Sequence, residues 1–404
     1  MGNRCYIMFV RSINKEEAFC LYQRFFQNQY VSVGAVMSGK TQQSGKRRVF
    51  NLLRAEGVIS RAALSQRCGL TRPAVSAIVD ELVREGLIFE AGRGGSTGGK
   101  PPILLRIAPG GRCAVGIDLG DDYLIRGVLC DCACNVLSSA ELEYSNNFDD
   151  ILNVTVRLVT LLAREAPADS LTGVGVAVSG VVDAEINEVT GATTLDIAGA
   201  GLAGQLEKRC GLPVILERRP NAAALAEGLF GAGKNYGSIV YLTSGRGVGA
   251  GIFIHGEIYR GCYGTAGEIG LLRLPGGGRV EENARPSAVA AEFSRRKGER
   301  CSFAQFLEAY QNHDPDAVAL ADVNAEQLAF AAETAVNLFD PEAIILGGRA
   351  LDFGNVWFQR FKKLVEINSA ARAAGGRIAV EKSFFGSSGV AVGGAQVVLD
   401  RIIK

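Results

Sequence analysis

The chain has 404 residues, more than one hydrophobic core usually supports, so we expect two or three domains. With 48% hydrophobic and 21% charged residues, its composition is that of an ordinary globular protein. No apolar run reaches the roughly 18 residues that a membrane-spanning helix needs, which excludes a predicted span. The ten cysteines show no spacing typical of a disulfide scaffold. They indicate reduced thiols and a cytoplasmic location.

The distribution of charge is more informative than the net charge of +1. Residues 44–112 contain 12 Lys and Arg against 5 Asp and Glu, so this segment carries +7 and the rest carries −6. A basic module attached to an acidic body indicates that the module binds a polyanion.

Residues 1–43 form an N-terminal extension with no convincing hydrophobic period and no secretory cleavage pattern. A more ordinary sequence begins at Met37, where we expect translation to start. The alternative is a genuine extension that is disordered or lies at a membrane surface.

Residues 44–109 predict a winged helix-turn-helix. Apolar spacing predicts a first helix over residues 46–56, and Ser60 is placed to cap a second helix that ends near Arg67. Thr71 is placed to cap a third helix, with Pro73 in its first turn, where no backbone N–H is needed. Two predicted strands, 87–89 and 103–105, flank a glycine-rich wing over residues 92–99.

In helix-turn-helix proteins the N-terminal residues of the second helix of the pair contact base edges in the major groove. Arg72 and Ser76 suit contacts with bases or phosphates, and the small, basic wing suits a minor groove. The alternative is a helix-turn-helix that binds another protein. The predicted DNA-binding residues are Arg61, Thr71, Arg72, Pro73, Ser76, Gly98, Gly99 and Lys100.

From Cys113 onwards strands alternate with helices, which predicts an α/β body of two lobes. The predicted strands cover residues 115–120, 124–129, 136–140, 173–178, 238–242 and 344–348, and the predicted helices cover 151–166, 220–230 and 324–339. Cys130, Cys132 and Cys134 alternate at period 2, so we expect them on one buried face of a strand. Zinc sites favour other spacings, and we expect no metal or cofactor there.

Glycine-rich turns follow several of these strands and suit phosphate binding. Their order resembles the ROK family (repressors, open reading frames and kinases), and most of all its repressor branch. The resemblance rests on Leu70-Thr-Arg-Pro-Ala-Val-Ser, Ser96-Thr-Gly-Gly-Lys-Pro, Asn221-Ala-Ala-Ala-Leu-Ala-Glu227, Gly245-Arg-Gly-Val-Gly-Ala-Gly251 and Gly264-Thr-Ala-Gly-Glu-Ile-Gly270.

The resemblance implies an actin-like, ribonuclease-H-type fold over residues 110–404. Lobe one would comprise residues 110–222 and a C-terminal helix over 388–404, and lobe two would comprise 223–387. The resemblance also marks vestigial nucleotide loops at Asp118, Gly120, Gly245, Gly247, Gly249, Gly347 and Gly348.

The kinase motifs are altered. Family kinases carry Gly-Thr in the first phosphate loop, where this chain has Asp121-Asp122, and Arg219 stands at the position of their catalytic base. A guanidinium cannot accept a proton at neutral pH, so we expect no kinase activity and predict no catalytic residue. The family's zinc cysteines are absent from residues 274–280, its sugar-binding His is Leu271, and its Asn-Leu is Thr194-Leu195.

Arg218 and Arg219 lie in the region that corresponds to the family's sugar-binding cleft, and two interpretations of them are open. They bind an anionic sugar derivative, or they belong to a decayed cleft in which they pair with Asp121 and Asp122 or are solvated. Glu268 is retained, and Glu281 is aligned loosely with the second sugar-binding Glu. The predicted effector-binding residues are Ser179, Gly180, Arg218, Arg219, Asn221, Glu268 and Glu281.

Together these features predict a transcriptional repressor of carbohydrate-related genes that binds a pseudo-palindromic DNA operator as a homodimer or tetramer, with a carbohydrate effector. One alternative is an active ROK sugar kinase. Another is a regulator that has no small ligand and is controlled by a protein partner.

Overall fold

The computed structural model describes residues 45–95, 101–120, 122–145, 147–191, 195, 197–368 and 377–403. The expectations for residues 1–43 (with Met37), Gly98, Gly99, Lys100, Asp121 and Thr194 lie outside these ranges. The chain divides into residues 1–44 and 45–404, and every described residue belongs to the second unit. Within the described ranges, no helix is long and apolar enough to cross a membrane.

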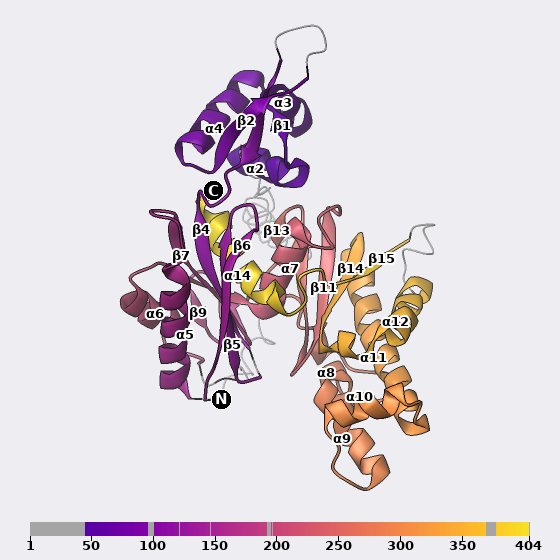
Figure 1. Ribbon diagram of the computed structural model, residues 1–404. Helices are drawn as coiled ribbons and strands as arrows, with labels where there is room; N and C mark the ends of the chain where they lie inside the picture. Colours follow the sequence, from indigo (N-terminus) through magenta and orange to yellow (C-terminus); the bar gives the residue numbers. More distant parts are fainter. Residues whose placement is uncertain are drawn as a thin grey trace, which may run out of the picture. The chain divides into compact units, whose positions relative to one another are not determined.

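Residues 45–107, here called the N-terminal module, have the predicted helices and wing strands (Figure 1). The elements are α2 (Gly45–Glu56), β1 (Ile59–Ser60), α3 (Arg61–Cys68), α4 (Arg72–Arg84), β2 (Ile88–Arg93) and β3 (Ile103–Ile107). The side chain of Ser60 accepts from Ala63 N (3.2 Å), and that of Thr71 accepts from Ala74 N (3.4 Å), so both predicted caps are confirmed. The short β1, which joins the sheet in the order β1-β3-β2, was not predicted.

The first sheet of the body has the order β10-β7-β4-β5-β6. Its strands are β4 (Cys113–Leu119), β5 (Leu124–Asp131), β6 (Val136–Glu143), β7 (Leu171–Val178) and β10 (Val214–Arg218). Helix α5 (Phe148–Ala163) packs against β5, β6 and α6 (Leu202–Cys210). Helix α14 (Gly389–Ile402) packs against β4 and β7, and its bounds agree with the predicted C-terminal helix.

The second sheet has the order β13-β12-β11-β14-β15. Its strands are β11 (Ser238–Ser244), β12 (Val248–Ile254), β13 (Glu257–Ile258), β14 (Ala343–Gly348) and β15 (Ala379–Lys382). The helices beside it are α8 (Val280–Ala284), α9 (Pro286–Lys297), α10 (Phe303–Gln311), α11 (Pro315–Phe339) and α12 (Asn355–Asn368). Short elements complete the body: β8 (Val182–Asp183), β9 (Glu188–Val189), η1 (Ile269–Leu271), η2 (Arg349–Phe353) and η3 (Gly386–Ser388).

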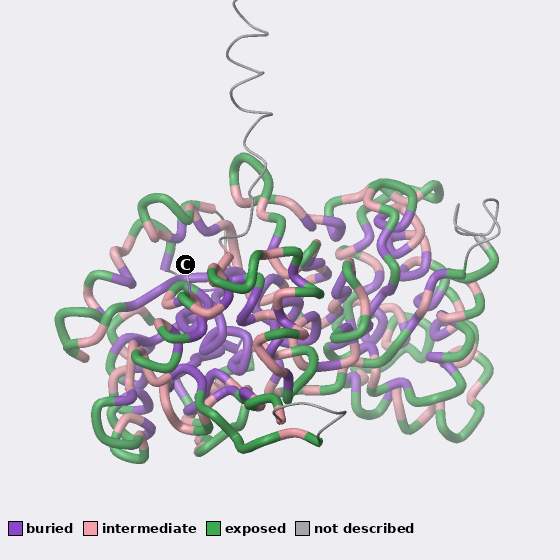
Figure 2. Tube along the Cα trace, turned by 90° about the horizontal axis from the view of Figure 1, so that it is seen from above, coloured by how far each residue is buried: buried purple, intermediate pink, exposed green. Residues whose placement is uncertain are grey.

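Helices α14 and α7 (Arg219–Phe230) join the two sheets, since α7 packs against α14, β11 and β12. The two helices approach closely because Gly393 has no side chain: a Cβ there would overlap the carbonyl oxygen of Ala222. The predicted lobe boundary after residue 222 falls inside α7. Figure 2 shows buried residues along the inner runs of the chain and exposed ones mainly at outer turns.

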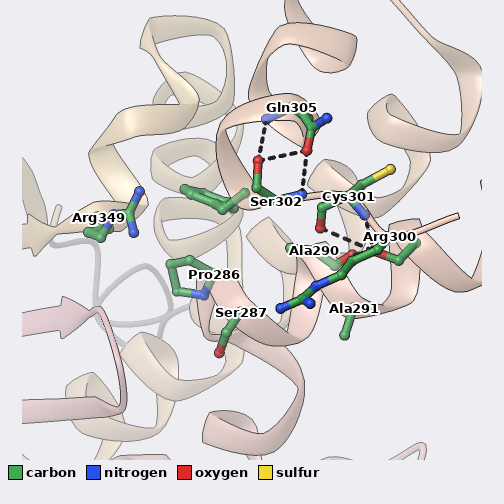
Figure 3. A pocket seen from close by; sticks show the side chains of 11 residues that line it. Pro286, Ser287, Ala290, Ala291, Arg300, Cys301, Ser302, Gln305 and Arg349 are labelled. Atoms are coloured by element: carbon green, nitrogen blue, oxygen red, sulfur yellow. Dashed lines mark hydrogen bonds between the residues drawn. The ribbon is translucent and has the colours of Figure 1, made fainter. Parts of the chain in front are cut away.

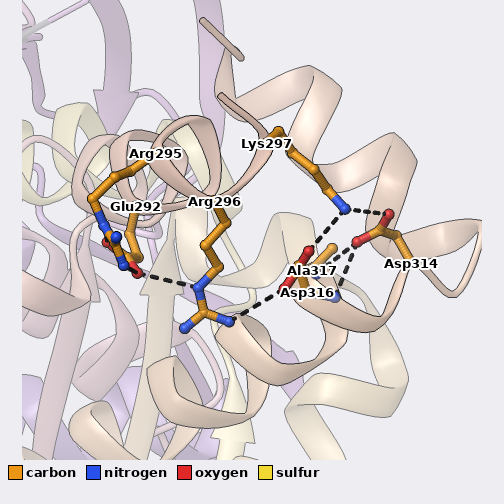
Figure 4. A network of polar contacts seen from close by, with 7 residues as sticks. All are labelled: Glu292, Arg295, Arg296, Lys297, Asp314, Asp316 and Ala317. Carbon is orange, nitrogen blue, oxygen red and sulfur yellow. Dashed lines mark hydrogen bonds and ion pairs between the residues drawn. The ribbon is translucent and has the colours of Figure 1, made fainter. Parts of the chain in front are cut away.

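A surface ion-pair network links α9 to the start of α11 (Figure 4). Lys297 Nζ lies 2.8 Å from Asp314 Oδ2 and 2.9 Å from Asp316 Oδ2, and Arg296 pairs with Glu292. Exposed pairs of this kind contribute about 0–1 kcal/mol each. The helical layer is therefore held mainly by its aromatic core, in which Phe353 stacks on Trp357.

The cysteine-rich segment differs from its prediction. Strand β5 ends at Asp131, and Cys134 has a left-handed φ of 64°, so it does not share a strand face with Cys130. The Asp131 carboxylate instead organises a turn by accepting from Ala133 N (3.0 Å) and Asn135 N (2.8 Å). Cys130 and Cys132 are buried, as expected. Among the described residues no three His, Cys, Asp or Glu are grouped as metal ligands.

We expect iodoacetamide at about pH 8 to alkylate exposed Cys262 and to leave Cys132 unmodified in the folded protein. Burial excludes the reagent and raises the pKa of Cys132 to about 12, so little thiolate is present. Peptide mass mapping after brief labelling measures this, with denatured protein as the control. Equal labelling of both residues in the folded protein would contradict the burial of Cys132.

Candidate functional site

The N-terminal end of α4 is the most exposed part of the helix pair. Thr71, Arg72 and Pro73 are exposed and Ser76 is half-buried, while Val75 and Val79 face the module core. The Thr71 hydroxyl serves as the helix cap. No hydrogen bond or ion pair is found for Arg72 within the described part of the chain. Its guanidinium therefore remains available for a nucleic-acid base or phosphate.

Arg61 has a different environment from the one predicted. It donates to the backbone oxygen of Ser76 (3.2 Å) and pairs with Asp80 Oδ1 (2.8 Å). Arg61 thus braces α4 against α3, and direct DNA contact by this residue stays a prediction. Sequence reasoning overlooked Arg93, which is exposed at the end of β2, where the wing begins. The sequence feature that could have identified Arg93 is its position as a basic residue directly before the glycine-rich tip of the wing.

The second candidate site lies where β10 meets α7, because the strand ends at Arg218 and the helix begins at Arg219. The first of its ion pairs involves Glu217, which is 3% exposed. Glu217 Oε2 accepts from Arg260 Nε (2.9 Å), and its Oε1 accepts from Asn221 Nδ2 (2.9 Å). Asn221 is fully buried, and its Oδ1 has no partner among the described atoms.

Arg218 is also buried, with 3% exposure. It pairs with the Glu268 carboxylate and donates to the backbone oxygen of Ala266. The structure therefore brings together two of the predicted effector-binding residues, Arg218 and Glu268. The expectation that this arginine is solvated is wrong, since burial is favourable only when the charge is paired.

Arg219 forms a two-point ion pair with Asp118, whose carboxylate is 2% exposed. Nε lies 2.6 Å from Oδ1, and Nη2 lies 3.2 Å from Oδ2. Asp122, one of the expected partners, is instead held by Arg126 at 2.6 Å. The predicted pairing with Asp122 is therefore wrong, and the predicted pairing with Asp121 lies outside the described residues. Arg219, predicted to stand at the position of the family's catalytic base, thus pairs with the aspartate of the first predicted nucleotide loop.

Glu281 lies at the second predicted nucleotide loop. Its Oε2 accepts from Val248 N at 3.4 Å, beside Gly247. A carboxylate of the chain thus faces an amide that could otherwise hold a phosphate. Within the same loop Gly245 N donates to Gly247 O (2.8 Å), and Gly249 lies against Pro220.

Two other predicted loops follow strands as expected. Ser179 and Gly180 come directly after β7 and are half-buried. Gly347 and Gly348 end β14, and a Cβ at Gly347 would overlap the Tyr241 ring. Gly120 at the end of β4 is buried, and its carbonyl oxygen accepts from the Tyr144 hydroxyl (2.6 Å).

A cavity of about 670 Å³ lies among α9, α10 and η2 (Figure 3). Exposed Arg300 and Arg349 line it together with Ser287 and Ser302. None of the predicted effector residues lines this cavity, and its nearest link to them in sequence is that Arg349 follows Gly348.

A winged helix-turn-helix and a two-sheet α/β body define a class of two-module proteins, and comparison with known proteins identifies the family. Residues 114–401 match the ROK family, and residues 46–88 match a winged helix-turn-helix DNA-binding domain. The chain belongs to the ROK family.

Its relatives include regulators and kinases. The chain is 26% identical to the xylose repressor of Bacillus subtilis over 363 residues, which cover 85% of this chain and 92% of that protein. It is 27% identical to the glucokinase of Streptomyces coelicolor over 275 residues, which cover 62% of this chain and 86% of that protein. The first match extends over more of this chain than the kinase match does.

Solved structures confirm the predicted fold. A ROK family transcriptional regulator, a homologue of the E. coli MLC protein, superposes with a TM-score of 0.73 at 23% identity, covering 89% of this chain and 96% of that chain. A ROK hexokinase from Thermus thermophilus has a TM-score of 0.63 at 24% identity, covering 72% of this chain and 99% of that chain. The actin-like kinase fold of the body was therefore predicted correctly.

Proposed function

We propose that the protein is a DNA-binding transcriptional repressor of carbohydrate-related genes, with a ROK body that senses an effector and catalyses no reaction. The observation that carries this proposal is the exposed start of α4, with Arg72 available, on a module fused to the ROK body. The xylose repressors that match both modules support the same assignment. The protein acts as a homodimer or tetramer, since paired heads suit a pseudo-palindromic operator.

The absence of kinase activity is proposed from the Arg219–Asp118 ion pair. Phosphoryl transfer to a sugar needs a base that takes the hydroxyl proton and a cradle for the phosphates. Arg219 cannot accept a proton, and Glu281 presents negative charge to the second loop. A direct test of the kinase alternative is ATP turnover with a panel of sugars, for which we expect no activity above the blank.

The β10–α7 junction is proposed to bind an uncharged sugar through Glu268, Asn221, Ser179 and Gly180. Among the described residues near the β10–α7 junction, three arginines pair with three carboxylates: Arg218–Glu268, Arg219–Asp118 and Arg260–Glu217. An anionic sugar would have to displace one of these carboxylates, whereas a neutral polyol would not. The unpartnered Asn221 Oδ1 suits a sugar hydroxyl donor.

Thermal-shift screening separates this proposal from its alternatives. A ligand at 100 times its Kd should stabilise the folded protein by about 2.7 kcal/mol. Shifts with neutral sugars support the proposal, and shifts with sugar phosphates or acids only would restore the anionic interpretation. No shift with either class favours a regulator that is controlled by a protein partner.

Replacing Arg72 by alanine should abolish selection of a specific DNA site. We expect wild-type protein to enrich one palindromic sequence from genomic fragments, and R72A to lose about 1–3 kcal/mol of binding free energy on it. The reason is that Arg72 is exposed at the end of α4 that enters the groove in this class of module.

The matched control is Arg84→Ala, which removes the same charge from the exposed C-terminal end of the same helix. R84A should select the wild-type site. If R72A and R84A lose affinity equally, the effect is one of net charge, and the assignment of Arg72 to base readout fails. If the wild-type protein enriches no site, the proposal of a DNA-binding repressor fails.

A further inference from the structure

One carboxylate of the body holds two arginines of the N-terminal module. Asp400, near the end of α14, is 8% exposed. It pairs with Arg47 and also with Arg54, whose Nη1 lies 3.2 Å from Oδ1. Both arginines belong to α2, seven residues apart, so they lie on the same face of the helix. Arg47 Nη1 also lies 3.2 Å from Glu257 Oε1 in β13, so α2 is fixed to the body through Asp400, which both arginines share, and through Glu257.

The guanidinium of Arg54 is almost completely enclosed, with 1% of its side chain exposed. It lies 4.8 Å from the ring centre of Phe50 and 5.5 Å from that of Phe230. Its Nε and Nη2 have no hydrogen-bond acceptor among the described atoms. An arginine cannot escape burial by losing its proton, so Asp400 is needed to compensate this charge. The interaction therefore favours one position of α2 over others.

Phe230 connects the contact between α2 and the body with the β10–α7 junction, the proposed effector site. It is the last residue of α7, whose first residue is Arg219. A helix of 12 residues spans about 17 Å from its first to its last residue. Helix α14, which carries Asp400, crosses α7 at Gly393. The two helices that hold α2 are thus the same two that join the sheets of the body.

The linker to the body makes a second attachment. Arg112 Nε donates to the backbone oxygen of Glu85, directly after α4 (3.2 Å), and Gly110 N donates to Asp131 Oδ2 (3.0 Å). A Cβ at Gly111 would overlap the carbonyl oxygen of Gly86. Because the module is tied at both α2 and α4, it is held as an extension of the body and not on a free tether.

We propose that Asp400 is a positioning residue that fixes the orientation of the DNA-binding module on the body, and so sets the spacing of operator half-sites that an oligomer can bind. The inference rests on the proposed function. It goes further by placing the determinant of spacing in the C-terminal helix of the body, outside the module that is proposed to bind DNA. Loss of the carboxylate leaves Arg54 without this acid and Arg47 with Glu257, so α2 is held less firmly and the module can rotate about its linker.

The test uses full-length Asp400→Asn and Arg54→Met. R54M keeps an unbranched side chain between the two rings and removes the buried charge, so it should fold even if D400N does not. The matched control is Asp352→Asn, which removes an exposed carboxylate of the body that is paired with Arg349. Affinities are measured for a single half-site and for palindromes whose half-site spacing is varied.

We expect D400N and R54M to bind a single half-site within about twofold of the wild type, to bind the optimal palindrome about tenfold more weakly, and to lose preference among spacings. D352N should behave as wild type. If the variants keep the spacing preference, or if they lose half-site and palindrome binding equally, Asp400 does not act by positioning and the inference is overturned.

A DNA-free measurement keeps this inference separate from the proposed function. Amide hydrogen exchange at the last turns of α7 and α14 should rise at least about fivefold in D400N, and not in D352N, because the module no longer covers them. Unchanged exchange overturns the inference. Suppose that the wild-type protein selects no DNA site and that amide hydrogen exchange is raised in D400N. This result would overturn the proposed function and still establish that Asp400 holds α2 on the body.

Discussion

Replacing Gly393 by alanine should destabilise the body by at least about 3 kcal/mol, near the upper end of the range for overpacked interiors. A Cβ at this position would overlap the carbonyl oxygen and carbonyl carbon of Ala222, and backbone atoms cannot swing away as a side chain can. Relief requires α14 and α7 to separate, which disturbs the contact between the two sheets. Urea unfolding followed by fluorescence of Trp357, the only tryptophan in the chain, measures the change.

The matched control is Gly204→Ala. Gly204 is exposed in α6, and a Cβ there meets no atom within 4 Å. Alanine has the higher helix propensity, so G204A should raise the free energy of unfolding by about 0.5–1 kcal/mol. If G393A unfolds at the wild-type urea concentration, α7 and α14 do not approach each other as described.

Local signals account for what could be predicted from the sequence. The helices of the N-terminal module were predicted because Ser60, Thr71 and Pro73 mark their starts and the apolar residues recur at helical spacing. The capping interactions involve residues only three apart, so spacing along the chain is enough to identify them. Strand β1 escaped prediction because two residues carry no periodic pattern, and it forms only by pairing with β3, more than 40 residues later.

The contacts at the β10–α7 junction could not be predicted from local sequence signals. Family resemblance placed Arg219 at the catalytic-base position but did not supply its partner. Asp122 was expected because it interrupts a phosphate motif, yet Asp118 and Arg219 are 101 positions apart and meet only where the end of β4 lies beside the start of α7. The same limit applies to Glu281, whose contact with Val248 depends on where α8 lies beside β12.

Removing the Arg219 side chain should cost about 3 kcal/mol in unfolding free energy, the lower end of the range for breaking a buried ion pair. In Arg219→Met the Asp118 carboxylate loses its two-point interaction with the guanidinium. It remains buried, with 2% exposure, unless the surrounding residues relax, so its charge is left without this partner. The lower end is appropriate because a quarter of the Arg219 side chain is exposed, so water can partly replace it. Urea unfolding of the variant measures the loss.

Arg126→Met is the matched control, since Arg126 has a similar exposure of 24% but pairs with Asp122, whose side chain is 55% exposed. An exposed carboxylate is resolvated when its partner leaves, so R126M should lose at most about 1 kcal/mol. Equal losses of unfolding free energy in R219M and R126M would mean that the burial of Asp118 does not make the Arg219–Asp118 pair more stabilising than the Arg126–Asp122 pair.

Arg219→Asp should restore the residue type of a catalytic base without restoring phosphoryl transfer. The new carboxylate would face Asp118 across the former ion pair, and two close carboxylates repel each other and resist joint ionisation. Glu281 would still face the amide of Val248, where a phosphate would need a donor. We expect no ATP-dependent phosphorylation of any sugar by R219D, measured by coupled ADP release. Turnover in R219D but not in wild type would show that the phosphate loops remain competent and that the arginine alone separates this chain from the family's kinases.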